Sequence, residues 1–385
     1  MALPSLTAVW DDRFRAYDLG SEHPFTERSR ALAADLLTAA TEASAPGTIE
    51  WVRAVDPAPV SELESFHLPE YVRWVESVSG RSEPFLLDGG DTPSFAGCYE
   101  AAARIVGGAD RALERVFQTS RPAFHPAGGL HHARPDRASG FCIFNDVAVA
   151  VARALGDHRK VAYLDIDAHH GDGVMYGFYE SGRVLDIDFH QDGRTLFPGT
   201  GFPNEVGRGD GSGHKVNAPL PPGSGDEALL PLFHRLVPPL LREFRPDVIV
   251  LQHGVDGHMG DALAHLQYTP AAYAEIDATV VALAHELTHG RLLVTGGGGY
   301  RGASVSRVLA RAGLVLAGLD LPEDREPLPE AWRGAYRESL GESAPRSWVD
   351  AVEPTPSRWR PEHEAKLVAE LESALGRRFP SVRSR

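Results

Sequence analysis

The chain has 385 residues, of which 43% are hydrophobic and 24% charged, as is typical of a globular protein with a large core. The net charge is −15 without a long basic run, which argues against nucleic-acid or anionic-membrane binding and suits a cationic substrate. The two cysteines form no CxxC motif, the N-terminus lacks a signal-peptide pattern, and no apolar run approaches the roughly 20 residues that span a bilayer, so we expect a cytoplasmic protein.

Short apolar runs alternate with segments of helical periodicity along the chain. Strands are predicted at residues 5–10, 51–55, 161–164, 183–189, 247–251 and 292–295, and helices at 27–40, 68–78, 98–117, 145–155, 229–244, 273–289, 303–319 and 361–375. Asn145 is expected to cap the fourth of these helices, and Pro238 and Pro239 break the helical pattern of the fifth. The alternation of strand and helix predicts an α/β fold with a parallel sheet.

The segment VAYLDIDAHHGDGV, residues 161–174, changes from an apolar strand to a dense group of acids and histidines. Buried charge is costly unless it is paired or bound to a metal ion. Asp167 and His169 stand at alternate positions and can therefore point at one ion. Asp256 is the best third ligand, because VLQHGVD repeats the order of strand followed by acid. Three such ligands leave a position for water and substrate, which is typical of a catalytic Zn²⁺ site.

Other polar loops also follow strands, and ligands of open parallel sheets bind at the carboxyl ends of the strands. The pair His131 and His132 lies in the glycine-rich loop GGLHHA and can supply an acid and a base for hydrolysis. Asp165 and Asp172 are suited to orient these imidazoles. Tyr300, in GGGGY, could donate to a developing oxyanion.

The blocks GGLHHA, SGFCIFND, YLDIDAHHGDGV, LFPGTG, LQHGVDGHMGD and GGGGY, in this order, resemble the histone deacetylase family of the arginase/deacetylase fold. The bacterial acetoin-utilisation branch is the most similar, and the resemblance extends from about His23 to Val308. It implies a single α/β domain with a central parallel eight-stranded sheet flanked by helices. We expect residues 1–320 to form the catalytic domain. Residues 321–385 would be a C-terminal extension whose terminal helix packs on the same domain.

The resemblance also implies roles for single residues. It agrees with the metal ligands inferred above, makes His132 the main proton shuttle and gives His131 a mainly electrostatic role. Tyr300 corresponds to a tyrosine that polarises the substrate carbonyl. Residues expected to contact substrate are the rim carboxylate Asp91, the tunnel walls Phe141 and Phe197, and the backbone of Gly140 near the leaving amine. Without the resemblance, Asp91 would be interpreted as a turn former.

Asp188 departs from the family, which often has Ser at this position in the strand behind the metal. The Ser helps to hold a structural potassium ion beside the backbone of Asp165, Asp167 and His169. We expect K⁺ or Na⁺ near these residues and Asp188 here, and Zn²⁺ or Fe²⁺ at the catalytic ligands.

The function implied is removal of acetyl groups from Nε-acetyl-lysine of proteins by metal-activated water with the histidine pair as acid and base. One alternative is hydrolysis of acetylpolyamines or of longer acyl amines. A ureohydrolase with two manganese ions fits less well, because His258 stands where a second carboxylate would be needed. The remaining alternative is a non-catalytic acyl-lysine binder. The sequence predicts no oligomeric state.

Overall fold

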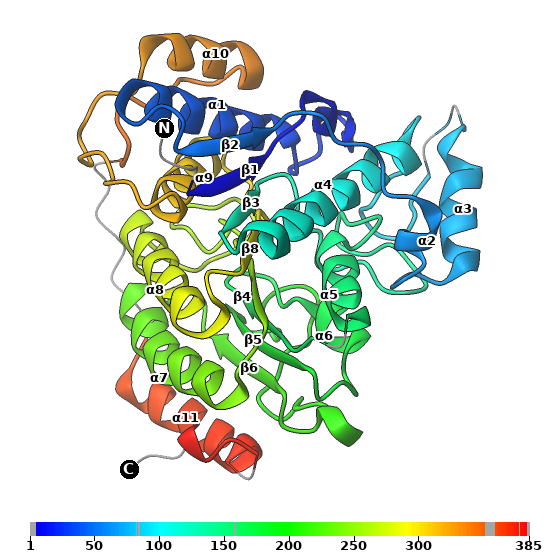
Figure 1. The fold of residues 1–385 in the computed structure, drawn as a ribbon, viewed down its shortest axis with the longest axis vertical. Coiled ribbons are helices and arrows are strands. Elements are labelled where there is room, and N and C mark those ends of the chain that lie inside the picture. The colour runs from blue at the N-terminus through cyan, green and yellow to red at the C-terminus, as the bar shows by residue number, and fades with distance from the viewer. Residues whose placement is uncertain are drawn as a thin grey trace.

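A parallel sheet of eight strands runs through the centre of the computed structural model, which describes residues 5–81, 83, 85–157, 159–350, 359–376 and 378–382 (Figure 1). The strand order is β2-β1-β3-β8-β7-β4-β5-β6. The strands are β1 (Leu6–Val9), β2 (Ile49–Val52), β3 (Ala123–His125), β4 (Val161–Asp165), β5 (Val184–Gln191), β6 (Lys215–Leu220), β7 (Val248–Gln252) and β8 (Leu292–Thr295).

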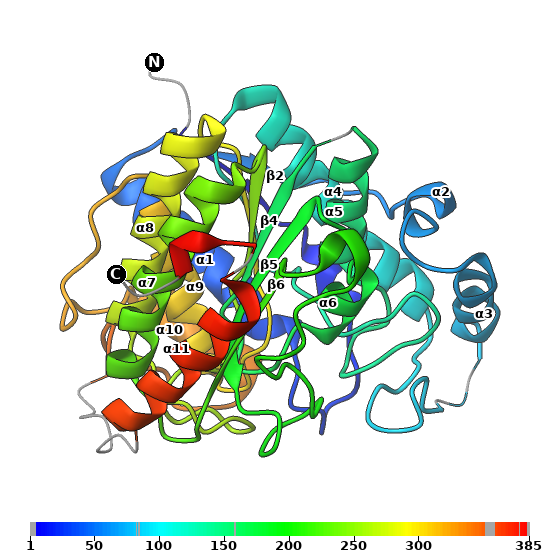
Figure 2. The ribbon, with the colours of Figure 1, turned by 90° about the horizontal axis from the view of Figure 1, so that it is seen from below.

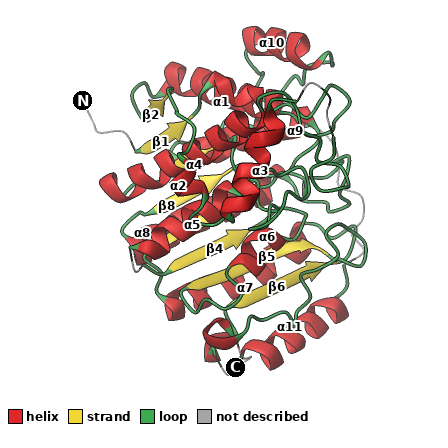
Figure 3. Ribbon diagram, turned by 90° about the vertical axis from the view of Figure 1, so that its right-hand side faces the viewer, coloured by secondary structure: helices red, strands yellow, loops and turns green. Residues whose placement is uncertain are grey.

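Helices cover both faces of the sheet, with α4, α5 and α6 on one side and α1, α7, α8 and α9 on the other (Figures 2 and 3). The helices are α1 (Glu27–Ser44), α2 (Val60–Leu63), α3 (Pro69–Ser79), α4 (Cys98–Thr119), α5 (Asp146–Gly156), α6 (Asp172–Gly177), α7 (Asp226–Phe244), α8 (Pro270–Thr288), α9 (Gly302–Leu316), α10 (Glu330–Leu340) and α11 (Pro361–Leu375). Short 3₁₀ helices lie at Asp12–Ala16, Gly209–Gly211 and Pro380–Val382. Within the described residues, none of these helices combines the length and apolarity needed to cross a membrane.

Burial on both faces explains the continuous apolar strands. In β4, Ala162 and Leu164 belong to the core cluster under α7 and α8, whereas Val161 and Tyr163 belong to the cluster under α4 and α5. A parallel sheet covered on both sides needs such strands rather than an alternation of apolar and polar residues. The predicted single α/β domain with an eight-stranded parallel sheet is confirmed.

Two of the eight strands do not show this apolar pattern, and the sequence did not predict them as strands. β3 has three residues and is bounded by Pro122 and Pro126. β6 forms one edge of the sheet and carries the polar residues Lys215 and Asn217 as well as Pro219, which an edge strand tolerates because it pairs on one side only.

The predicted helix at residues 229–244 is confirmed, and α7 continues through Pro238 and Pro239 to Phe244. An interior proline costs a helix about 3 kcal/mol. Leu236 and Leu240 on the same helix are fully buried in the core, and burial of this apolar face outweighs the lost backbone hydrogen bonds. The short helices α2 and α6 and the helix α10 were also not predicted from the sequence.

The C-terminal residues contribute to the same core as the sheet. Trp332 of α10 donates its Nε1 hydrogen to the carbonyl oxygen of Leu32 in α1 at 2.8 Å. Leu371 and Leu375 of α11 are fully buried in the cluster that also contains β5 and α7. The boundary at residue 320 stays a prediction.

The strand order brings four polar loops together. β3, β8, β7 and β4 are neighbours in the sheet, and all four are parallel. Their carboxyl ends therefore lie side by side, and the loops that follow them carry the histidine pair, the GGGGY segment, Asp256 and the Asp167–His169 segment. This arrangement determines where the candidate site lies.

Candidate active site

Asp167, His169 and Asp256 form a buried cluster in which the donor atoms of all three side chains lie within 4.8 Å of one another. The His169 Nδ1 atom is 2.8 Å from Asp256 Oδ2 and 3.3 Å from Asp167 Oδ1. One nitrogen and two carboxylate ligands match the donor set of an open catalytic zinc site. The residues present therefore fit a divalent transition metal, as their spacing in the sequence predicted.

Backbone and amide donors hold the two carboxylates in place. Asp167 Oδ2 accepts hydrogen bonds from Gln252 Nε2 at 2.9 Å and from the Gly298 amide at 2.7 Å. Asp256 Oδ1 accepts from the Ala168 amide at 2.7 Å. A Cβ atom at position 298 would lie 2.1 Å from Asp256 Oδ2, which explains why glycine follows β8 at this point. Gln252 was not singled out from the sequence, although a polar residue ending an apolar strand was available as a signal.

The two adjacent histidines lie beside this cluster, each held by a carboxylate. His131 Nδ1 is 2.8 Å from Asp165 Oδ2, and His132 Nδ1 is 2.7 Å from Asp172 Oδ1. The Nε2 atoms of the two rings are 3.1 Å apart. The structure thus brings together the four residues that were expected to form two imidazole–carboxylate pairs.

The two rings differ in charge at neutral pH. Burial lowers the pKa of His131, but the carboxylates of Asp165 and Asp167 outweigh it and raise the pKa to about 10. Burial and the neighbouring His131 lower the pKa of His132 to about 4, in spite of the hydrogen bond with Asp172. A protonated ring therefore lies next to a neutral ring that can accept a proton.

Two further residues complete these pairs and were not identified from the sequence. The Arg134 guanidinium bonds Asp172 Oδ2, with its Nε atom 3.1 Å away. The Tyr163 hydroxyl donates to Asp165 Oδ2. Burial raises the pKa of Asp172, but hydrogen bonding to His132 and the charge of Arg134 outweigh it and lower the pKa to about 2. Arg134 lies two residues beyond the histidine pair, and this proximity was the available signal.

Asn145 connects the histidine loop to α5. Its side-chain oxygen accepts from the Ala148 amide at 2.8 Å, which confirms the predicted N-cap. Its amide nitrogen donates to the carbonyl oxygens of His131 and Ala133, at 2.9 and 3.0 Å. One buried side chain therefore caps a helix and holds the backbone on both sides of His132.

We expect Asn145→Ala to lower the free energy of unfolding by about 2–4 kcal/mol, because it removes the cap and leaves two buried carbonyl groups unpaired. Asn145→Ser is the matched control, since a hydroxyl restores the cap but not the two amide donors, and it should regain about 1 kcal/mol. Urea unfolding of the three proteins measures both values. Equal stability of the wild type and the alanine variant would contradict this account.

Aromatic rings surround the approach to the histidines. The Phe141 and Tyr300 ring centroids are 5.9 Å apart, and the Phe197 and His132 centroids are 5.1 Å apart. Gly140 lies between these walls, because a Cβ atom there would lie 2.7 Å from His132 Cδ2 and 2.8 Å from Phe197 Cε1. Three of the four expected substrate-contact residues, Gly140, Phe141 and Phe197, thus lie together with Tyr300 near the histidine pair.

Tyr300 is held from its backbone and keeps its hydroxyl proton. Its amide donates to Asp261 Oδ2 at 2.9 Å, and its ring centroid lies 6.1 Å from that of His169. Burial and the nearby Asp256 raise the pKa of Tyr300 well above its ordinary value. The hydroxyl is therefore a hydrogen-bond donor at neutral pH.

Asp91 lies at the exposed tip of the loop between α3 and α4. Asp88 shapes this tip, since its Oδ1 accepts from the amides of Gly90, Asp91 and Thr92 at 2.8, 3.1 and 3.1 Å. Partial burial and the charge of Asp88 raise the pKa of Asp91. Asp91 is thus exposed on this loop, and its role as the rim carboxylate stays a prediction.

The residues expected near a monovalent cation lie behind the histidine pair. Asp188 Oδ2 accepts from the Gly171 amide at 2.7 Å, and Asp188 Oδ1 is 2.6 Å from His190 Nδ1. Asp165 is the register partner of Asp188 in the adjacent strand. Two neighbouring buried carboxylates are compatible with a cation, and K⁺ or Na⁺ at this position stays a prediction.

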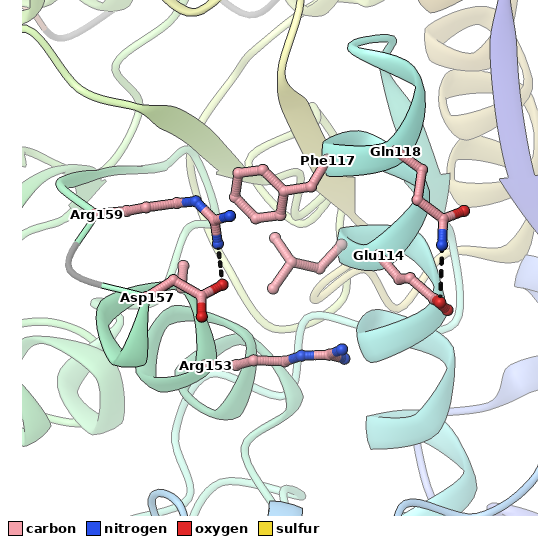
Figure 4. Close-up of a pocket in the computed structure, with 8 residues that line it drawn as sticks. Glu114, Phe117, Gln118, Arg153, Asp157 and Arg159 are labelled. Atoms are coloured by element: carbon pink, nitrogen blue, oxygen red, sulfur yellow. Dashed lines mark hydrogen bonds and ion pairs between the residues drawn. The ribbon is translucent and has the colours of Figure 1, made fainter.

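A different pocket, of about 230 Å³, lies between the C-terminal ends of α4 and α5 (Figure 4). Both helix ends lead toward the amino ends of strands, so this pocket is at the opposite edge of the sheet from the histidines. Its charged groups pair with one another or with neighbours: Arg159 with Asp157, and Arg153 with Asp110. We therefore assign the candidate active site to the Asp167–His169–Asp256 cluster at the carboxyl ends of the strands and not to this pocket.

Comparison with known proteins gives a consistent result. The family pattern described as histone deacetylase domain matches residues 23–316. The chain is 35% identical over 381 residues to the acetoin utilization protein AcuC of Bacillus subtilis (strain 168), covering 95% of this chain and 96% of that protein. It is 34% identical over 354 residues to AcuC of Staphylococcus xylosus, with 90% of each chain covered. The crystal structure of the HDA15 HD domain is similar, with a TM-score of 0.79, 26% identity, and 99% and 97% of the two chains covered.

Proposed function

The chain belongs to the histone deacetylase family, and we propose that it removes acetyl groups from the Nε atom of acetyl-lysine side chains in proteins. The observation that carries this proposal is the buried Asp167–His169–Asp256 cluster next to the carboxylate-bound histidine pair. Deacetylation is the activity of the family in general. The acetyl-lysine substrate and the roles of the individual residues are our proposal.

In this proposal the three clustered side chains hold Zn²⁺, or Fe²⁺ if that ion is loaded in the cell. When bound, the metal would supply a Lewis acid for the attacking water and the acyl carbonyl. His132 Nδ1 is engaged with Asp172 and Nε2 with His131, so in this proposal Nε2 exchanges its contact with His131 for the attacking water, accepts the proton and later returns it to the leaving amine. The positive charge of His131 favours the developing negative charge, and the Tyr300 hydroxyl donates to the oxyanion.

The substrate class follows from the approach to this site. Phe141, Phe197 and Gly140 would enclose the aliphatic part of an acyl-lysine side chain. The exposed carboxylate of Asp91 would accept hydrogen bonds from backbone amides of a peptide at the rim. An acetylated polyamine is the second candidate, because the chain carries a net charge of −15 and such a substrate is a cation.

The side chain of His258 supports a single catalytic metal. Its Nδ1 atom is 2.7 Å from the Met259 carbonyl oxygen and 3.1 Å from the Ser304 hydroxyl. It is thus engaged beside the cluster rather than within it. A ureohydrolase with two metal ions is correspondingly less well supported.

The first experiment is to measure acetate release from an acetyl-lysine peptide and from an acetylated polyamine, with metal content determined on the same sample. Turnover of the peptide alone is the expected result. Preference for the polyamine would mean that the substrate is a small acetylated amine, and the proposed roles of the residues would stay the same. Absence of turnover on both, with one metal ion bound per chain, would contradict the deacetylase proposal and favour a binding protein or a longer acyl substrate.

Removal of the metal should abolish turnover, since without it the site lacks its electrophile. We expect dialysis against a chelator to reduce the rate below about 1% and added Zn²⁺ to restore it, because one Lewis acid accounts for several kcal/mol. A hydroxamate should inhibit by chelation. Full activity of the metal-free protein would exclude a metal-dependent mechanism.

The proposal extends to the domain boundary, a second cation and the cellular compartment. Residues 1–320 form the catalytic domain and 321–385 an extension packed on it. A monovalent cation binds near Asp165 and Asp188. The protein acts in the cytoplasm.

A further inference from the structure

His23 contacts two parts of the substrate approach at once. Its Nε2 atom is 3.1 Å from the carbonyl oxygen of Asp91. Its ring packs edge-on against Phe141, with centroids 4.4 Å apart and an interplanar angle of 86°. The segment before α1 thus connects the loop of the rim carboxylate with a wall of the tunnel. No role for His23 was predicted from the sequence.

The hydrogen bonds around His23 identify its tautomer. The Phe25 amide donates to His23 Nδ1 at 3.1 Å, so Nδ1 has to be the acceptor. In a neutral imidazole the other nitrogen then carries the hydrogen. Nε2 therefore donates to the Asp91 carbonyl oxygen, and the direction of this bond follows from the Phe25 contact.

Hydrogen bonds other than those of His23 hold both parts that His23 connects. The Thr92 hydroxyl accepts from the Phe141 amide at 2.9 Å, and the Tyr17 hydroxyl donates to the Phe141 carbonyl oxygen at 2.6 Å. These bonds hold the Phe141 backbone, which has a φ of 70°. Asp88 organises the turn around Asp91. None of these bonds involves the Asp91 carbonyl oxygen, which instead accepts the hydrogen bond from His23.

We propose that His23 is a positioning residue for the substrate, which fixes the Asp91 carboxylate relative to the tunnel entrance through a hydrogen bond to the Asp91 carbonyl oxygen. This inference rests on the proposed function, in which Asp91 binds the peptide backbone. His23 touches neither the metal ligands nor the histidine pair. It should therefore affect peptide binding more than the chemical step.

Two substitutions separate the two contacts of His23. His23→Phe keeps a ring against Phe141 but removes the donor to Asp91. His23→Gln places an amide nitrogen near the position of Nε2 and removes the ring. Both variants are compared with the wild type on an acetyl-lysine peptide and on N-acetylbutylamine, which lacks the peptide backbone that Asp91 would bind.

For His23→Phe we expect the KM of the peptide to rise about five- to tenfold, the scale of one neutral hydrogen bond, while kcat changes less than about twofold. The KM of N-acetylbutylamine should not change. His23→Gln should bring the peptide KM back to within about threefold of the wild type, because the donor is restored. In an Asp91→Ala background, His23→Phe should have no further effect, since coupled residues are not additive.

Several results would overturn the inference. These are an unchanged peptide KM in His23→Phe, an equal rise for both substrates, a fall in kcat of the same size, or additivity with Asp91→Ala. If the wild type turns over neither substrate, the proposed function fails. Amide hydrogen exchange then tests independently whether His23 holds the loop of Asp91. Faster exchange at residues 88–92 in His23→Phe but not in His23→Gln supports the link, and equal exchange in all three proteins contradicts it.

Discussion

The His132→Ala variant should lose kcat by a factor of about 10²–10⁴, the contribution of one positioned acid–base group, and should keep its metal. The ring is the neutral member of the histidine pair, because burial and the neighbouring His131 lower its pKa to about 4. Its Nδ1 atom is 2.7 Å from Asp172, so proton transfer would use Nε2, which lies 3.1 Å from His131 Nε2 and has to leave that contact. Neither atom belongs to the cluster of metal ligands. Steady-state kinetics and metal analysis on one preparation measure both quantities.

His131→Ala is the matched control, because it removes the adjacent ring at the same depth. Its effect should be smaller, since the protonated ring of His131 acts through its charge and not by accepting a proton. Loss of metal from His132→Ala would show that the ligands are wrongly assigned. A kcat equal to that of the wild type would remove His132 from the mechanism.

For Tyr300→Phe we expect kcat to fall by a factor of about 10²–10³, the scale of one oxyanion donor. Burial and Asp256 raise the pKa of Tyr300 well above its ordinary value, so the hydroxyl is protonated and can donate. The substitution removes one oxygen atom and keeps the ring that packs against Phe141. KM should change little, because the hydrogen bond forms mainly in the transition state.

Tyr273→Phe controls for the loss of a buried hydroxyl elsewhere. Tyr273 lies in α8, and among the described residues its hydroxyl has no hydrogen-bond partner. We therefore expect activity within about twofold of the wild type, as for most substitutions away from a functional contact. An equal loss in both variants would mean that the effect of Tyr300→Phe is structural.

The residues of the proposed metal site could be predicted to lie close together, because they follow apolar strands, whereas the histidine pair follows β3, which was not predicted as a strand. Asp167 and Asp256 could be placed on neighbouring loops once their strands were taken as parallel, and the structure brings them together. The order of the strands in the sheet could not be predicted from the apolar runs. It depends on which helices pack against which face, and that is a property of the whole core.

The residues that support the site were harder to predict. Arg134 and Asn145 act through hydrogen bonds to partners distant in the sequence, Asp172 and His131 among them. Apart from the position of Arg134 two residues after the histidine pair, their local pattern is that of a surface arginine and an ordinary helix cap. The strand β6 was missed for a related reason, since its buried Lys215 bonds the Val184 carbonyl oxygen at 2.7 Å and so is compatible with an interior position.

The position of β8 in the sheet has a consequence for biosynthesis. β8 lies between β3 and β7, although both are made earlier during translation. A nascent chain that ends before residue 292 therefore exposes the facing edges of two strands, and it lacks the Gly298 amide that donates to Asp167. The non-local pairing makes late insertion of this strand a slow step in folding. The proposed metal site therefore becomes complete only after about the last quarter of the chain has begun to emerge from the ribosome, because Gly298 lies in it.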